Sequence, residues 1–183
     1  MGGRAGGGAS GGMGTRSRGG GGLARALSVA ESSIRDRAVE NAYIFDAQGN
    51  EVWRRIEGEM HQMSSNPKVN ELMNRLAQNS RRVSIPSEKM LNNIVTHNHP
   101  GSPMNSLSDG DVLGAIRGNA KEIRAVTSGF TFSMKRPRGG WGKIDATKLG
   151  QAFTASLKQT KDTHKTWTAL SKQFGLNYTA TPR

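Results

Sequence analysis

Hydrophobic and polar positions along the first half of this chain predict both helices and strands. Apolar residues recur at helical spacing over residues 23–39, on one face of a predicted helix. The following stretch, 41–56, contains two apolar runs separated by a turn at Gly49, which predicts a β-hairpin. A second helix is expected to begin at Asn66 and Pro67, because asparagine caps helices and proline suits their first position.

The second half of the chain continues this mixture. Short apolar runs at 91–96, 123–127 and 130–134 predict strands, and the apolar spacing over 112–116 predicts a helix between the first two. From residue 146 onward, apolar positions recur near helical spacing, which predicts one long or two consecutive basic amphipathic helices. Helices interleaved with strands indicate a mixed α/β or α+β domain.

The most informative polar residues follow the strand at 91–96. His97 and His99 are two positions apart, so on an extended backbone both imidazoles point to the same side. Pro100 and Gly101 end the strand, and Asp109 is expected near the start of the next helix. Two histidines and one carboxylate are three zinc ligands, and a catalytic zinc keeps its fourth position for water.

The strings His97–Pro100 and Ser106–Asp109 resemble the JAMM motif of the MPN (JAB) metallopeptidase-like superfamily. The similarity covers roughly residues 34–134 and is greatest to the RadC-like and the phage- or toxin-associated branches. The resemblance implies a curved mixed sheet flanked by helices and zinc-dependent hydrolysis of amide or isopeptide bonds in a protein or peptide substrate. It implies that His97, His99 and Asp109 bind zinc. It also implies that Ser106 helps to hold the transition-state oxyanion.

The resemblance further implies a glutamate that acts as general acid and base. Glu40 immediately precedes the apolar run that begins at residue 41, which is the place that the family pattern gives to this glutamate. Glu57 and Glu59, which follow the second strand of the hairpin, are the alternatives.

Two frames of the Ser-x-x-Asp step are open. Six residues separate His99 from Ser106, one fewer than in the commonest family pattern. Ser108 and Asp111 preserve the same step with eight intervening residues, one more than that pattern. Ser106 and Asp109 are preferred, and Asp111 is an alternative third ligand.

Two other functions are weighed against hydrolysis. The contiguous string His97-Asn98-His99 suggests a metal-dependent nuclease, but HNH nucleases are named for residues dispersed over a ββα-metal motif. A noncatalytic MPN-like assembly or nucleic-acid-binding module is the other alternative. His61 and His164, which are isolated in the sequence, are interpreted as ordinary surface or core residues.

Charge and glycine content divide the chain into three regions. Residues 1–22 hold 12 of the 24 glycines and predict a disordered basic tail. Residues 23–137 form the predicted metallohydrolase domain, and 138–183 a basic helical extension. Of the net charge of +12, residues 135–183 contribute +8, from ten Lys and Arg against two Asp. Such a segment favours nucleic acid or an acidic partner, unless it is merely a solvated face.

Two absences set further limits. The chain has no cysteine, which excludes disulfides, cysteine-ligated zinc and thiol catalysis. No apolar run is long enough to predict a membrane span or a secretory signal. We therefore expect a soluble protein made in the cytoplasm, and the phage resemblance adds the host cytoplasm or a virion to that expectation.

Overall fold

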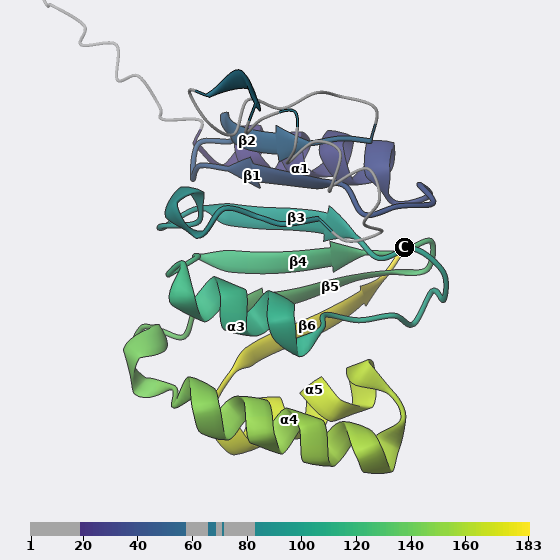
Figure 1. Cartoon of the computed structure of the whole chain (residues 1–183), viewed down its shortest axis with the longest axis vertical. Helices are drawn as coiled ribbons and strands as arrows, with labels where there is room; N and C mark the ends of the chain where they lie inside the picture. The colour runs from purple at the N-terminus through teal and green to yellow at the C-terminus, as the bar shows by residue number, and fades with distance from the viewer. Residues whose placement is uncertain (1–18, 58–65, 69–70, 72–82) are drawn as a thin grey trace, which may run out of the picture.

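The computed structural model describes residues 19–57, 66–68, 71 and 83–183. These residues form a six-stranded mixed sheet and four α-helices (Figure 1). The strands are β1 (Ala42–Phe45), β2 (Glu51–Arg55), β3 (Ile94–Asn98), β4 (Glu122–Val126), β5 (Phe130–Lys135) and β6 (Asn177–Pro182). The helices are α1 (Gly19–Ile34), α3 (Asp109–Arg117), α4 (Ala146–Thr160) and α5 (Thr163–Phe174). The predicted mixed α/β class is confirmed.

The strand order is β2-β1-β3-β4-β5-β6. Only β3 and β4 pair in parallel among these strands, because α3 carries the chain back across the sheet between them. The predicted hairpin is present as β1 and β2. Its turn is held by Asp46, whose carboxylate accepts hydrogen bonds from the backbone N–H groups of Gln48 and Asn50. Gly49 supplies the positive φ of +92° that this turn requires.

Alternation along β3 divides its side chains between the two faces of the sheet. Ile94 packs with Phe45 against α1 on one face, whereas Val95 belongs to the main core on the other face. Figure 1 shows α1 behind the sheet and α3 in front of it. Because His97 is two residues after Val95, its imidazole lies on the face that α3 covers.

A buried ion-pair network fixes α1 to its face of the sheet. Glu31, which is 2% exposed, accepts hydrogen bonds from the Thr96 hydroxyl at 3.1 Å and from Arg124 Nε at 2.6 Å. It also binds Arg183 Nη2 at 2.5 Å, so the last residue of the chain is held by the first helix. Burying a carboxylate is tolerated here because both of its oxygens are paired.

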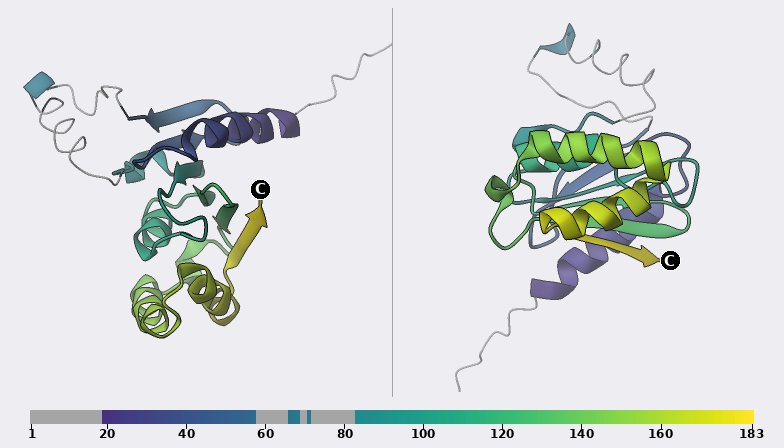
Figure 2. Two further views of the ribbon diagram at one scale, coloured as in Figure 1. Left: turned by 90° about the vertical axis from the view of Figure 1, so that its right-hand side faces the viewer. Right: turned by 90° about the horizontal axis from the view of Figure 1, so that it is seen from below.

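The region from residue 138 onward packs on the same core as the rest of the sheet. Leu149 in α4 and Trp167 in α5 are both fully buried in the cluster that contains Val95. The predicted basic helices are thus confirmed as a pair, which Figure 2 shows side by side beneath the sheet. The sequence did not predict β6, which adds an antiparallel edge strand next to β5.

Some predictions differ from the structure or lie outside it. The first helix begins at Gly19, so residues 19–22, predicted as part of the disordered tail, are helical. It ends at Ile34, five residues earlier than predicted, because the backbone that follows is taken up by hydrogen bonds to Asn98. The first 18 residues, most of the second predicted helix after Pro67, and both Glu59 and His61 lie outside the described residues.

Candidate metal centre

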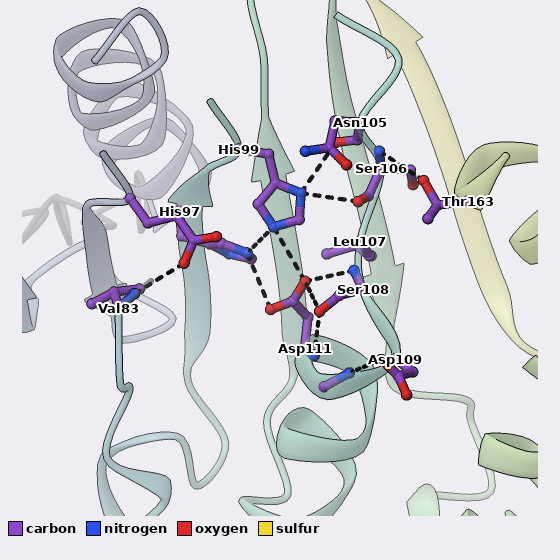
Figure 3. A network of polar contacts seen from close by, with 12 residues as sticks. Val83, His97, His99, Asn105, Ser106, Leu107, Ser108, Asp109, Asp111 and Thr163 are labelled. Atoms are coloured by element: carbon purple, nitrogen blue, oxygen red, sulfur yellow. Dashed lines mark hydrogen bonds and ion pairs between the residues drawn. The ribbon is translucent and has the colours of Figure 1, made fainter. Parts of the chain in front are cut away.

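The two histidines come from the end of β3. His97 is the fourth residue of the strand and is paired with Ala42 on β1 and Ala125 on β4. His99 lies just beyond the strand, where its backbone N–H still donates to Val126 at 2.9 Å. The extended backbone therefore continues through His99, and both imidazoles point to the same side as predicted (Figure 3). They are 1% and 6% exposed.

The carboxylate that meets them belongs to Asp111 at the start of α3. Ser108 caps this helix, and its backbone N–H and hydroxyl donate to one carboxylate oxygen of Asp111 at 2.7 and 2.8 Å. In return, the Asp111 backbone N–H donates to the Ser108 hydroxyl, which completes a capping box. The same contacts that begin the helix thus fix the direction of the carboxylate.

The three side chains converge on one point. The Nε2 atoms of His97 and His99 lie 2.9 Å apart, and each lies 3.3 Å from a different oxygen of Asp111. Ligand atoms about 2.0–2.1 Å from a tetrahedral zinc lie about 3.3 Å from one another. The spacing therefore fits a divalent cation among the three side chains, and His97, His99 and Asp111 are a group that could bind one.

Asp109, which the sequence analysis preferred as the third ligand, does not belong to this group. Its carboxylate turns back to the N–H of Gly110 at 2.9 Å, and Figure 3 shows it directed away from both histidines. It lines a different cavity, of about 850 Å³, between α3 and α4. The alternative prediction, Asp111, is the one that the structure brings to the histidines.

Ser106 is also placed differently from its predicted role. It is 1% exposed, and its hydroxyl lies 2.6 Å from that of Tyr178 on β6. Ser108, by contrast, lines the pocket that holds His99 and Asp111. Of the two Ser-x-x-Asp frames, Ser108 and Asp111 are therefore the pair that both reach the candidate metal centre.

Glu40 lines the same pocket, which has a volume of about 380 Å³. One of its carboxylate oxygens accepts a hydrogen bond from the Val83 N–H at 2.9 Å. Glu57 is exposed and is absent from the described lining of this pocket. Of the candidate glutamates that the structure describes, Glu40 is the one beside the candidate metal ligands.

Asn98, between the two histidines, holds the segment that carries Glu40. Its side chain points to the opposite face from the imidazoles, where it is fully buried. The amide nitrogen donates to the carbonyls of Arg37 and Val39, and the amide oxygen accepts from the Asn41 N–H at 2.6 Å. Sequence reasoning missed this role, although a buried asparagine at the end of a buried strand signals a polar partner.

The electrostatics of the cluster suit a cation. Burial alone would raise the pKa of Asp111, but the charges and hydrogen bonds of His97 and His99 hold it well below the ordinary value. Burial disfavours the charged form of His99, yet its hydrogen bond to Asp111 and the charges of Asp111 and Glu40 raise its pKa overall. Negative charge therefore dominates around the imidazoles, which is the environment that a divalent cation requires.

No family model, no curated protein and no solved structure matches this chain. Within the described residues, no helix is long and apolar enough to cross a membrane. The geometry of the site is therefore the basis for its functional interpretation.

Proposed function

We propose that this protein is a zinc-dependent hydrolase of amide or isopeptide bonds with a JAMM-like active site. One observation carries the proposal. His99, Asp111 and Glu40 line a single pocket, and the buried His97 completes the three-ligand group with His99 and Asp111, so a three-ligand site adjoins a carboxylate that is not needed as a ligand. A structural zinc site uses four protein ligands, whereas three ligands with an adjacent carboxylate are typical of a hydrolytic centre.

Zinc is the metal that this donor set favours. Imidazole suits zinc, copper, iron and nickel, and one carboxylate alongside two imidazoles also occurs at the zinc of metallopeptidases. The bound cation would polarise the scissile carbonyl and lower the pKa of water in the site.

The residues of the chain would move the protons. Glu40 takes a proton from the attacking water, whose oxygen forms the new bond to the carbonyl carbon. The C–N bond then breaks, and Glu40 returns the proton to the departing amine nitrogen. Water is consumed, and a carboxylic acid and an amine are released. The Val83 N–H, which binds one Glu40 oxygen, holds the carboxylate in place between these two transfers.

Ser108 takes the part that the family resemblance gave to Ser106. Ser108 lines the pocket, and rotation about its Cα–Cβ bond, away from its hydrogen bonds with Asp111, would direct the hydroxyl to a developing oxyanion. The Ser106 hydroxyl is enclosed and already paired with Tyr178. Placement of His-x-His on a strand end and Ser-x-x-Asp at a helix start is what supports the kinship to the JAMM motif.

Elemental analysis and turnover test the proposal together. Purified protein is expected to hold one zinc per chain and to cleave members of a fluorogenic peptide library. Glu40→Gln should retain the metal, because glutamine still accepts from the Val83 N–H, and should lose turnover. Glu57→Gln is the matched control and should retain both. The proposal is refuted if wild-type protein holds no metal after zinc loading.

A second candidate role concerns the basic surface of α4 and α5. Both acidic residues of this region, Asp145 and Asp162, serve as helix caps. The six lysines between residues 143 and 172 are all exposed: Lys143, Lys148, Lys158, Lys161, Lys165 and Lys172. We propose nucleic acid as the partner of this surface, through counterion release. Binding to duplex DNA should weaken steeply with salt, and Lys158→Glu with Lys165→Glu should abolish it.

A further inference from the structure

The loop between the histidines and Asp111 is fastened to the C-terminal part of the chain at two consecutive residues. The Ser106 N–H donates to the Thr163 hydroxyl at 3.1 Å, and the Ser106 hydroxyl lies 2.6 Å from that of Tyr178. The indole N–H of Trp167 donates to the Leu107 carbonyl at 2.7 Å. Backbone and side chain of the loop are thus held by α5 and β6.

The loop that α5 and β6 hold also forms hydrogen bonds with His99, one of the candidate metal ligands. Nδ1 of His99 lies 2.9 Å from the Ser106 carbonyl oxygen and 3.1 Å from the Asn105 carbonyl oxygen (Figure 3). A carbonyl oxygen only accepts hydrogen bonds, so Nδ1 must carry a proton. Nε2 of neutral His99 is then left with its lone pair, directed at the Asp111 carboxylate. The loop therefore selects the tautomer that can bind a metal ion.

Tyr178 has a further partner that makes the chain of contacts continuous. Its hydroxyl lies 2.9 Å from Nδ1 of His164 on α5. Burial raises the pKa of Tyr178 to about 12, so the group remains a neutral hydroxyl. The contacts therefore run from His164 through Tyr178 and Ser106 to His99. The isolated position of His164 in the sequence gives no sign of this contact.

His97 offers a contrast within the same site. Its Nδ1 is buried, and no hydrogen-bond partner is found for it among the described residues. His99 is thus the ligand whose orientation is set by hydrogen bonding, whereas His97 is held by the strand that carries it. Contacts that orient a ligating histidine contribute to metal affinity even though they do not touch the ion.

We propose that Thr163 and Tyr178 are positioning residues of the metal centre. They hold the Ser106 peptide so that its carbonyl keeps His99 in the tautomer with Nε2 free. The C-terminal helices and last strand would thereby set the metal affinity of a site to which they contribute no ligand. This inference rests on the proposed metal site, but it does not depend on hydrolysis.

The test removes both hydroxyls that hold Ser106. Thr163→Val with Tyr178→Phe changes little volume and leaves all three ligands intact. The zinc dissociation constant, measured by competition with a chromophoric chelator, is expected to rise roughly 10- to 100-fold. The matched control is Thr168→Val with Tyr43→Phe. It removes one threonine hydroxyl that is bonded to its own helix and one tyrosine hydroxyl on the α1 face of the sheet, opposite the histidines, where it contacts Ser33.

A second measurement separates positioning from general loss of stability. Long-range ¹H–¹⁵N spectra of the metal-free protein at alkaline pH should show His99 protonated at Nδ1 alone in the wild type and in the control. In the test variant, both tautomers should be populated. If the double variant does not fold, Thr163→Val is compared with Thr163→Ser, which keeps the hydroxyl and should restore zinc affinity.

The outcomes divide cleanly. Weaker zinc binding in the test variant alone, with mixed tautomers, supports the inference. An unchanged dissociation constant, or an equal loss in the control, overturns it. If wild-type protein binds zinc without cleaving any peptide, hydrolysis fails and the inference stands. If it binds no zinc, the proposed function fails and the tautomer spectra alone decide about the positioning of His99.

Discussion

The assignment of Asp111, and not Asp109, as the third ligand gives the sharpest test of the metal centre. Asp111→Asn removes one negative ligand, while the amide oxygen of asparagine still accepts from the Ser108 N–H and keeps most of the helix cap. Asp109→Asn makes the same chemical change two residues away, where the carboxylate binds only Gly110 in the described contacts. Zinc binding should therefore be lost in the first variant and retained in the second.

The expected magnitude follows from linkage. A ligand at about 1,000 times its dissociation constant stabilises the folded state by about 4.1 kcal/mol. For a chain of this size, each kcal/mol raises the melting temperature by about 2–4 °C, so zinc should raise it by about 8–16 °C. Weakening of the Ser108–Asp111 cap costs about 0.5–2 kcal/mol in the absence of metal. The zinc-dependent part of the shift is therefore well resolved from the capping effect.

Differential scanning calorimetry with zinc and with a chelator measures both parts. Wild type and Asp109→Asn should show the full zinc-dependent shift, and Asp111→Asn should show almost none. A full shift in Asp111→Asn would refute the ligand assignment. Loss of the shift in Asp109→Asn would show that the loop and the start of α3 rearrange around the ion, contrary to the geometry described.

Three further predictions follow from the same contacts. Glu40→Gln should lower kcat by about 10²- to 10⁴-fold with zinc content unchanged, measured by steady-state kinetics beside elemental analysis; an equal loss in Glu57→Gln would remove the special role of Glu40. Zinc affinity should fall as pH falls through the raised pKa of His99, because zinc binds only the neutral imidazole, and calorimetry in buffers of different ionisation enthalpy should detect proton release. In metal-free protein, the pH dependence of folding stability has the opposite sign to that of zinc affinity. Because the folded state binds the His99 proton more tightly than the unfolded state does, protonation of His99 stabilises the fold below pH 6.5, and this stabilisation is lost as pH rises. Asn98→Ala should destabilise the metal-free protein by about 1–3 kcal/mol in chemical denaturation, because the Asn41 N–H loses its buried acceptor, and a neutral effect would contradict the role given to Asn98.

Local sequence patterns were sufficient to predict the strands that carry the two histidines and their neighbours. The hairpin of β1 and β2 follows from the turn at Gly49, and β3 from the apolar run before His97. The strand β6 has no comparable signal, because Asn177–Pro182 is a polar and largely exposed edge strand that ends in proline. Its place next to β5 depends on packing between distant parts of the chain. The contacts of Tyr178 to Ser106, 72 residues away in sequence, were for the same reason beyond sequence reasoning.

The choice between the two aspartates could have been made from helix geometry. Successive residues of an α-helix are about 100° apart around its axis, so residues two positions apart point in nearly opposite directions. Asp109 and Asp111 therefore cannot both face β3. A capping box also requires an acidic or amide side chain three residues after the cap, and Ser108 with Asp111 satisfies this rule directly before the apolar Val112. Because the capping-box partner of Ser108 and the proposed ligand are the same side chain, Asp111, the contacts that begin α3 also direct its carboxylate toward the histidines.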